Sequence, residues 1–398
     1  MINLDFNFAN GKKKVLLRAP VLTQSGYGVH ARQIARWLLS KENIDLHVQP
    51  LQWGVTPWLL NSASQNGLVG HIMERSVDPK RGEYDVSIQL QLPNEWDAQL
   101  AKVNIGVTAG VETDKCNPTW INHCNLMTHI IVPSKHAVET FKNTGGLTKP
   151  IDVIPEAYPD ELASATLTKV DDMSFSTPFN FLIVGQLTGN NPENDRKNIF
   201  YAIKWFCETF KDVPDVGLVI KTNTGRNTSL DRNSVKQILS KLLSEVRPWQ
   251  FPKLHLLHGD LTDAEMASLY RHRQIKALLA PTRGEGYGLP ILEAAACGLP
   301  VITTGWSGHM DFMGKGKFIK LDHVLVDVHD SRVDGSIFVK GARWAQPSEN
   351  DFKQRLLKFY KGSDVPRQWA EELKSRILKE YSQVAIQKIY DEKMAEYL

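Results

Sequence analysis

Residues Ala280 to Thr304 read APTRGEGYGLPILEAAACGLPVITT, and this stretch carries most of the information about fold and chemistry. A short apolar run ends at Ala280. Three glycines then alternate with Glu285 and Tyr287, and an apolar segment of helical period begins near Leu289. Pro290 suits the first turn of a helix, because the N–H that proline lacks would have no partner there. The stretch predicts a buried strand, a glycine-rich loop and a helix, in that order.

The glycine-rich loop has the composition of a phosphate site. Glycine lets backbone N–H groups and the positive end of a helix approach an anion closely. We therefore expect a phosphorylated ligand to meet the N–H groups of Gly286, Tyr287, Gly288 and Leu289.

Two carboxylates flank this loop. Glu285 and Glu293 stand eight residues apart and can face the same cleft, where their oxygens would accept hydrogen bonds from sugar hydroxyls. The alternative is that Glu293 is a solvated helix residue and that the glycines only form a turn.

Short apolar runs alternate with longer segments of helical period along the rest of the chain, which predicts parallel sheets covered by helices. The first half offers strands at residues 14–18, 44–51, 85–91, 103–108, 129–132 and 151–154. A second series offers strands at residues 179–184, 216–221, 253–258 and 275–280, with helices at 198–210, 229–246 and 263–271. The predicted fold class is α/β, with two doubly wound domains facing each other across a cleft.

The domain boundaries follow from composition. Residues 163–178 are rich in Ser, Thr and Asp, lack sustained apolar periodicity and end in a proline, so we expect a linker there. This places an N-terminal domain at residues 1–170 and a C-terminal domain at residues 171–364. Residues 365–398 contain no glycine and have apolar residues at helical spacing, which predicts one or two closing helices.

Composition excludes several classes of protein. Hydrophobic residues make up 42% and charged residues 23% of the chain, which is typical of globular domains and not of disordered, collagenous or coiled-coil proteins. A net charge of +3 is too small to predict a nucleic-acid or lipid surface without a local patch. Four cysteines, no secretory signal and no run of about 20 apolar residues predict a cytoplasmic protein with neither a disulfide framework nor a transmembrane segment.

Metal chemistry has one weak candidate. Cys116, His123 and Cys124 lie near each other in sequence, but no second close pair of ligands accompanies them. We therefore predict that they pack a helix and that the protein holds no metal.

The chain resembles the retaining GT-B glycosyltransferases of family GT4. The run E-G-Y-G-L-P-I-L-E followed by A-A-A-C-G-L-P-V-I-T is similar to the E-x7-E signature of that family. Further segments resemble family motifs, the last of them more loosely: residues 179–185, 196–198, 258–260, 132–134 and 343–347. The resemblance implies two Rossmann-like domains, with C-terminal helices that cross back onto the first.

The resemblance also implies a nucleotide-sugar donor that is bound without a metal or other cofactor. Glu293 would bind the ribose hydroxyls, Glu285 the hydroxyls of the donor sugar, and Lys197 the diphosphate, while Gly259 would lie near the base. Lys197 has an independent argument, because the sequence NDRKN concentrates two cations at a strand-to-helix junction. Arg196 is a further donor-binding candidate, although we expect it to point away from Lys197.

Two segments of the first domain complete the expected site. Gly26 and Gly28 belong to a G-x-G-x-x-A loop that would face the donor phosphates and the acceptor. As a dinucleotide fingerprint this loop is weak, because Asp45 falls at the start of the next strand and not at its end. Glu112 follows the strand at 103–108, where family members often have a histidine, so it would bind sugar hydroxyls or offset positive charge at the anomeric carbon. The alternative role for Glu112 is a helix cap.

The sequence departs from the family pattern at Gln186, where many members have a phosphate-binding arginine. The second cation of the phosphate site is therefore open among Arg196, Lys221 and Arg226.

The expected activity is transfer of a hexosyl or pentosyl group to a hydroxyl acceptor, with retention of configuration through same-face attack. No D-x-D motif is present, which disfavours the metal-dependent GT-A type. The acceptor is open among a glycan, a lipid-linked sugar and modified DNA, and Trp53, Trp58, Trp96 and Trp120 are candidates for stacking on a ring. A DNA acceptor would need a basic face, for which the candidates are Lys12 to Lys14, Arg32, Arg36 and Lys41.

Three other functions remain open at this point. They are a GT-B-like phosphorylase, a nucleotide-sugar epimerase and a non-catalytic nucleotide-sugar-binding subunit. The donor base and the oligomeric state do not follow from the sequence.

Overall fold

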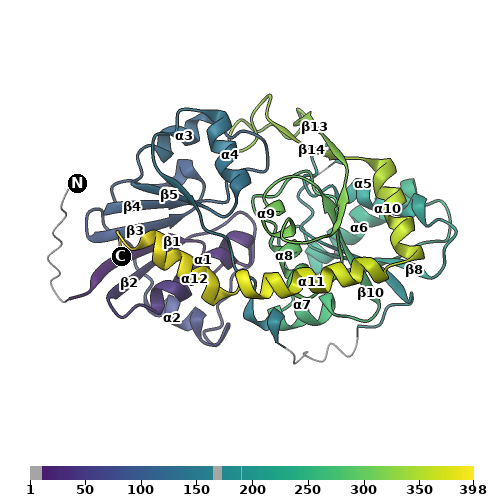
Figure 1. The fold of residues 1–398 in the computed structure, drawn as a ribbon, viewed down its shortest axis with the longest axis horizontal. Coiled ribbons are helices and arrows are strands. Elements are labelled where there is room, and N and C mark those ends of the chain that lie inside the picture. Colours follow the sequence, from purple (N-terminus) through teal and green to yellow (C-terminus); the bar gives the residue numbers. More distant parts are fainter. Residues whose placement is uncertain (1–10, 165–172, 190) are drawn as a thin grey trace.

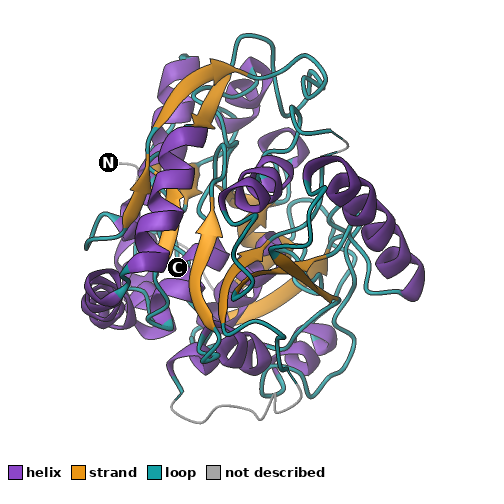
Figure 2. Ribbon diagram, turned by 90° about the vertical axis from the view of Figure 1, so that its right-hand side faces the viewer, coloured by secondary structure: helices purple, strands orange, loops and turns teal. Residues whose placement is uncertain are grey.

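The computed structural model describes residues 11–164, 173–189 and 191–398 (Figure 1). Within these ranges the chain forms two six-stranded parallel sheets, with strand orders β2-β1-β3-β4-β5-β6 and β12-β11-β10-β7-β8-β9. Figure 2 shows the strands enclosed by helices. The predicted α/β class, with two Rossmann-like halves, is confirmed.

The first sheet has one continuous apolar face, whereas its other face includes buried polar side chains such as Ser87 and Asn104. Val15 lies beside Leu46 on one side and Val86 on the other, and all three side chains are buried. Its strands are β1 (Lys13–Ala19), β2 (Ile44–Pro50), β3 (Tyr84–Leu90), β4 (Ala101–Val107), β5 (His129–Val132) and β6 (Ile151–Val153). The helices of this half are α1 (Gly26–Leu39), α2 (Leu68–Glu74), η1 (Pro93–Glu95), α3 (Pro118–Cys124), α4 (Lys135–Thr144) and η2 (Asp160–Ala163).

The second sheet follows the predicted alternation closely. Its strands are β7 (Phe179–Val184), β8 (Val216–Thr222), β9 (Lys253–His258), β10 (Ile275–Ala280), β11 (Val301–Thr304) and β12 (Ile319–Leu321). Its helices are α5 (Ile199–Thr209), α6 (Ser229–Val246), α7 (Asp263–Tyr270), α8 (Leu289–Ala296), α9 (Met310–Met313) and α10 (Glu349–Lys361).

Several elements of this half are absent from the sequence-based expectations, namely β11, β12, α9, α10 and a hairpin. An antiparallel hairpin pairs β13 (His323–Asp327) with β14 (Arg343–Pro347). Its first strand is only partly covered, and Val324 is 64% exposed. A strand of this kind lacks the continuous apolar run that marked the others.

The C-terminal segment forms α11 (Asp364–Glu380) and α12 (Gln383–Met394), which run from the second domain to the first (Figure 1). The first of these helices packs on α8. The second contacts α1, where Trp37 Nε1 donates to Asp391 Oδ1 at 2.7 Å and His30 Nε2 lies 3.1 Å from the Tyr390 hydroxyl. The predicted crossover is confirmed.

The connection between the halves is described only in part. The expected linker starts within η2, and residues 165–172, which include the predicted boundary between 170 and 171, lie outside the described residues. One apolar core runs from the first sheet through α8 to the C-terminal helices, so the two halves share buried surface. Among the described helices, none has the length and apolar character needed to cross a membrane.

Candidate functional site

The loop between β10 and α8 crosses from the second domain to the first. The Gly286 carbonyl accepts a hydrogen bond from Ser134 Oγ at 2.7 Å. A Cβ on Gly286 would lie 2.6 Å from the Ala109 carbonyl oxygen, which is closer than a side chain can approach. Glycine at this position therefore lets the loop lie directly against the end of β4.

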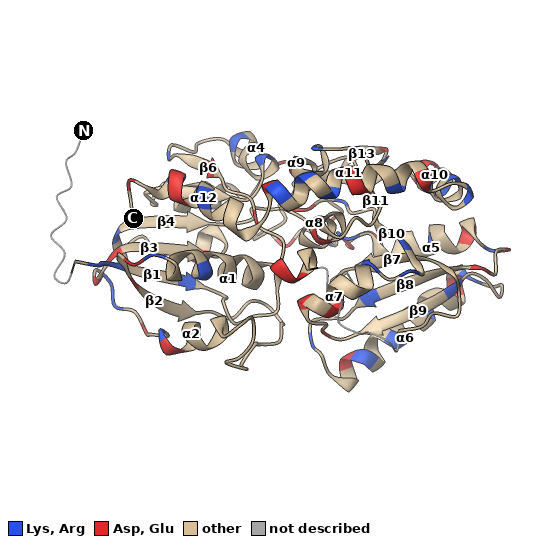
Figure 3. Cartoon of the chain, turned by 60° about the horizontal axis from the view of Figure 1, so that its bottom comes forward, with Lys and Arg blue, Asp and Glu red and all other residues tan. Residues whose placement is uncertain are grey.

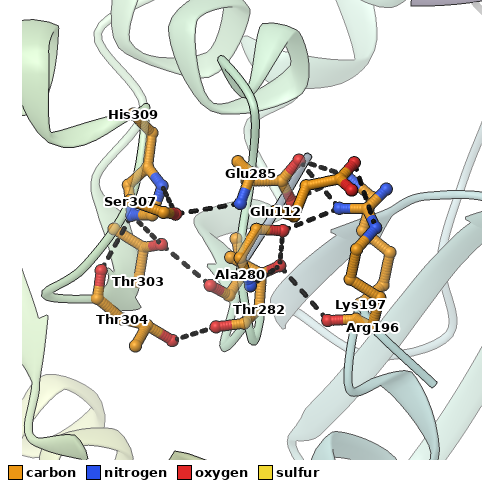
Figure 4. A network of polar contacts seen from close by, with 11 residues as sticks. Glu112, Arg196, Lys197, Ala280, Thr282, Glu285, Thr303, Thr304, Ser307 and His309 are labelled. Atoms are coloured by element: carbon orange, nitrogen blue, oxygen red, sulfur yellow. Dashed lines mark hydrogen bonds and ion pairs between the residues drawn. The ribbon is translucent and has the colours of Figure 1, made fainter. Parts of the chain in front are cut away.

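Four charged side chains meet beside this loop, and we call them the four-charge cluster: Glu112, Arg196, Lys197 and Glu285 (Figure 4). Lys197 Nζ donates to both oxygens of Glu285, at 2.7 and 2.8 Å. Arg196 Nη1 lies 3.2 Å from Glu285 Oε2, and Arg196 Nε lies 3.3 Å from Glu112 Oε1. Two loops of the second domain and one of the first thus contribute to one network.

The cluster is shielded from water, and this determines its electrostatics. Burial opposes the ionisation of Glu285, yet the Lys197 ammonium and the Arg196 guanidinium hold its pKa down at about 2. Burial lowers the pKa of Lys197, while the Glu285 carboxylate acts in the opposite direction. The cluster is therefore a set of matched charges, and a small cavity beside it is lined by Val184, Thr282 and Pro290 in addition to Lys197 and Glu285.

The expectation that Arg196 points away from Lys197 is wrong. Helix α5 starts only at Ile199, and Asn198 before it has a left-handed backbone with φ of 57°. Arg196 and Lys197 therefore precede the helix, and their side chains are not separated by helical rotation. Both converge on Glu285.

The backbone of Glu285 is held by a segment that the sequence analysis did not assign. Ser307 Oγ accepts from the Glu285 N–H at 2.9 Å (Figure 4). The Gly308 N–H donates to the Glu285 carbonyl at 2.9 Å. His309, fully buried, lies with Nδ1 3.4 Å from Ser307 Oγ and Nε2 2.7 Å from the Thr304 carbonyl. The signal that could have found Ser307 is its place between two glycines directly after a buried strand.

Glu293 occupies a separate position on α8. Its Oε2 accepts from the Tyr270 hydroxyl at 2.9 Å, and burial raises the pKa of its carboxyl to about 7. No contact between Glu293 and Glu285 is found among the described residues. Glu293 is half-buried and hydrogen-bonded, so it is not a solvated helix residue.

The loop around Gly259 is built on positive φ and on Lys221. Gly259 has φ of 105°, and a Cβ there would lie 2.5 Å from Asn227 Oδ1. Lys221 Nζ donates to the Gly259 carbonyl at 2.6 Å, while Arg226 is exposed. Of the three candidates for the second cation, Arg196 is therefore the one that stands beside Lys197.

The glycine loop of the first domain faces α8. Gly26 opens α1, and a Cβ there would lie 3.9 Å from Leu289 Cδ1. The Gly28 N–H donates to Ser25 Oγ at 2.9 Å. The Tyr27 ring stacks on Trp53 with centroids 3.9 Å apart. Of the remaining tryptophan candidates, Trp96 and Trp120 are buried in the core, whereas Trp58 is 40% exposed.

Tyr287 contributes more than its backbone. Its side chain is buried, and its hydroxyl donates to the Glu156 carbonyl in the segment that leaves the first domain, at 2.7 Å. This side chain ties the glycine-rich loop to the interdomain crossing, a role that the sequence analysis did not foresee.

The candidates for a basic face are not free to bind a polymer as a group. Arg32 is 4% exposed and donates to the carbonyls of Val21 and Thr23. Arg36 pairs with Asp160, and Lys41 pairs with Asp391. In Figure 3, basic and acidic positions are interspersed over both halves.

Cys116 and Cys124 are buried in an apolar cluster with α3 and α4, as predicted for helix packing. In the described ranges, no three His, Cys, Asp or Glu side chains are grouped in a way that could hold a metal ion.

Comparison with known proteins gives a consistent result. The profile of the family described as Glycosyl transferases group 1 matches residues 196–333, which contain Arg196, Lys197, Glu285 and Glu293. A protein of Thermosipho melanesiensis, named Probable sucrose-phosphate synthase, is 28% identical over 167 residues, which are 41% of this chain and 35% of that protein. The match thus spans about a third of the relative's length.

Two solved structures share the fold across nearly the whole chain. Sucrose-phosphate synthase from Thermosynechococcus elongatus superposes with a TM-score of 0.61 at 12% identity, covering 97% of this chain and 100% of that one. HepE of Anabaena, in complex with UDP and glucose, superposes with a TM-score of 0.60 at 14% identity, covering 96% and 100%. In sequence and in fold, the chain resembles the group 1 glycosyltransferases. The resemblance and the GT-B fold expected from the sequence are confirmed.

Proposed function

We propose that this chain is a nucleotide-sugar-dependent glycosyltransferase that transfers a sugar to a hydroxyl acceptor. The observation that carries the proposal is the convergence of Arg196 and Lys197 on Glu285, beside a glycine-rich loop at the start of α8. In open α/β sheets, ligands bind outside the carboxyl ends of the strands, and this loop follows β10 directly. The match to group 1 glycosyltransferases over residues 196–333 supports the same activity.

The two cations suit the chemistry of glycosyl transfer. The reaction passes through an oxocarbenium-like state in which negative charge grows on the departing diphosphate. Lys197 and Arg196 would stabilise that charge, together with N–H groups of residues 286–289. We propose retention of configuration without metal, with the leaving phosphate taking the acceptor's proton.

The carboxylates divide the remaining roles. Glu293 would accept from the ribose hydroxyls, and Glu285 from hydroxyls of the donor sugar. Glu112 reaches the cluster from the first domain, where it would offset positive charge at the anomeric carbon. The helix-cap alternative for Glu112 is less favourable, because its carboxylate is engaged by Arg196.

The donor most worth testing first is a uridine diphosphate sugar. HepE of Anabaena, which shares the fold, has been crystallised with UDP-glucose. We propose UDP-glucose as the first donor for this chain on that ground alone.

The decisive experiment is titration of UDP-glucose into the full chain by calorimetry. Lys197→Ala and Arg196→Ala should each weaken binding by about ten- to a hundredfold, the range for a lost hydrogen bond to a charged group. Lys204→Ala is the matched control, because Lys204 lies on α5 and pairs with Glu208 at 3.7 Å, away from the cluster. Equal affinity in the wild type and the Lys197 variant would contradict the proposed donor site.

Product analysis separates the other functions. Sugar transfer that requires an added hydroxyl acceptor supports a glycosyltransferase, whereas sugar phosphate formed from inorganic phosphate would indicate a phosphorylase. An isomerised nucleotide sugar without acceptor would indicate an epimerase. Binding with no turnover over an acceptor panel would indicate a non-catalytic subunit.

A further inference from the structure

The two strands of the hairpin are joined by residues 328–342, which we call the bridging loop. It belongs to the second domain but contacts the first, since Asn117 Nδ2 donates to the carbonyls of Gly335 and Ser336 at 2.9 and 3.0 Å. At the end of the loop, Arg343 Nε pairs with Asp114 Oδ2 at 2.8 Å. Figure 1 places β13 and β14 on the side of the second domain that faces α4. The loop is therefore positioned over the domain junction.

Arg332 in the bridging loop stacks on an aromatic ring, and no ion pair to it is found among the described residues. Its guanidinium carbon lies 4.2 Å from the centroid of the Phe338 ring, so the ring fixes its plane. Its Nε is shielded from solvent and has no hydrogen-bond partner among the described residues. In the same ranges, no carboxylate forms an ion pair with this guanidinium. A stacked guanidinium with unused N–H groups matches the planar geometry of a carboxylate or phosphate.

The acidic groups nearest to Arg332 are already committed to other contacts. Asp334 Oδ1 accepts the backbone N–H groups of Ser336, Ile337 and Phe338, at 2.9, 2.7 and 3.1 Å, and so holds the turn of the loop. Glu112 is paired with Arg196. Burial lowers the pKa of Arg332, with the charges of Asp334, Glu112 and Arg196 acting on it as well. Arg332 thus stands within electrostatic reach of the four-charge cluster.

A second cation stands on the other side of the same junction. Lys115 of the first domain is half-buried, and its Nζ lies 3.6 Å from the position that a Cβ on Gly341 would take. No carboxylate or carbonyl is bonded to this ammonium within the described ranges. Glu112, three residues earlier in the same loop, belongs to the cluster, so this loop carries one cluster member and one unmatched cation.

We propose that Arg332, supported by Lys115, binds an anionic group on the acceptor, and that the acceptor is therefore a sugar bearing a phosphate or a carboxylate. The inference rests on the proposed function for its donor, whose diphosphate is met by Lys197 and Arg196. Arg332 is supplied by a different loop, and the charges of Glu112 and Arg196 act on it. An acceptor bound there would present its hydroxyl next to the donor sugar while its charge is held by the bridging loop.

Binding of three matched sugars tests the proposal. Glucose, glucose 6-phosphate and glucuronate are titrated by calorimetry into the full chain saturated with UDP. We expect at least one anionic sugar to bind about tenfold or more tightly than glucose, and Arg332→Ala to abolish that difference. Lys340→Ala is the control, because Lys340 is an exposed cation in the same loop and should leave the difference unchanged. Phosphate and carboxylate are distinguished by which of the two anionic sugars binds more tightly.

Two results would overturn the inference. One is an affinity for both anionic sugars no greater than that for glucose. The other is equal anionic-sugar binding by the Arg332→Ala and Lys340→Ala variants, which would leave Arg332 only the role of packing on Phe338. Arg332→Lys, which keeps the charge, should retain part of the preference. Failure of UDP itself to bind would count against the proposed function, and the sugar titrations, repeated without UDP, would still report on Arg332.

Discussion

Glu285 and Glu293 belong to one short segment, yet their carboxyl groups have opposite electrostatic environments. Two cations hold the pKa of Glu285 down to about 2, while burial beside a hydroxyl raises that of Glu293 to about 7. A charged partner favours the ionised form, and desolvation without one favours the neutral form. At neutral pH, Glu285 is therefore ionised, whereas Glu293 is close to its pKa and exchanges a proton readily.

The raised pKa of Glu293 predicts how stability changes with pH. The ordinary value for this carboxyl is 4.5, and the folded value is about 7. A proton is retained more tightly in the folded state, so the contribution to stability is complete below pH 4.5 and is lost as pH rises to 7. Relative to the wild type, Glu293→Gln should gain about 2 kcal/mol of unfolding free energy between pH 5 and pH 8.

Urea unfolding at a series of pH values measures this gain. Glu42→Gln, at an exposed position, is the control for the same change of side chain. A stability difference between wild type and Glu293→Gln that stays constant with pH would contradict the assigned shift.

At the residue scale, the sequence could identify groups that belong to a contiguous motif. Glu285 and Glu293 were singled out because they flank a glycine-rich loop and a helix start, and Lys197 because it stands at a strand-to-helix junction. Ser307 was missed because its partner Glu285 belongs to a different loop, and Arg332 was missed because no recognisable motif surrounds it. Arg196 was included, but its expected direction was wrong, because the left-handed backbone of Asn198 before α5 cannot be read from residue types.

At the scale of elements, the segment after β11 acts as a support for the loop after β10. Ser307 holds the Glu285 N–H while its own backbone has φ of 87°, a conformation that favours glycine. At this position the hydrogen bond favours serine, whereas the backbone conformation favours glycine. The hydrogen bond from the Glu285 N–H to Ser307 Oγ is therefore formed at a cost in backbone conformation.

Two substitutions at this position separate the hydrogen bond from the backbone. Ser307→Ala loses the acceptor and keeps the unfavourable φ, so it should lower the unfolding free energy by about 1–3 kcal/mol. Ser307→Gly also loses the acceptor but relaxes the backbone, and should be about 1 kcal/mol less destabilised than the alanine variant. Guanidinium unfolding of both variants measures the difference, and the reverse order of stability would show that the backbone is not strained.

Regular elements were predictable where short segments are rich in apolar residues. The strands at 179–184, 253–258 and 275–280 have the bounds expected from their apolar runs. The β13–β14 hairpin was missed because it is partly exposed and its partners lie sixteen or more residues apart across the bridging loop. Its role depends on contact with the first domain, which local sequence does not encode.

At the scale of the whole molecule, the two domains meet through backbone at the glycine-rich loop. A Cβ on Gly284 would collide with the Glu112 carbonyl oxygen, and the Gly286 position is similarly close to Ala109. This close approach brings Glu112 within 3.3 Å of Arg196. The contact between Glu112 and Arg196 therefore depends on the close approach of the two domains.

Gly284→Ala should hold the domains apart. We expect turnover to fall by about tenfold or more, because misplaced groups lose their orientation relative to the reacting atoms. Small-angle scattering should show a larger radius of gyration than in the wild type. Gly362→Ala is the control, since a Cβ there meets nothing within 4 Å. An unchanged radius of gyration with full turnover would indicate that the loop accommodates the added Cβ without separating the domains.

The close contact between the glycine-rich loop and the first domain has a consequence for the order of steps in the proposed reaction. Because Gly284 and Gly286 lie directly against the first domain, we expect the proposed donor to enter while the two domains are apart. Closure would then exclude water that could otherwise hydrolyse the donor. Under the proposed function, we expect the nucleotide product to leave when the domains separate again.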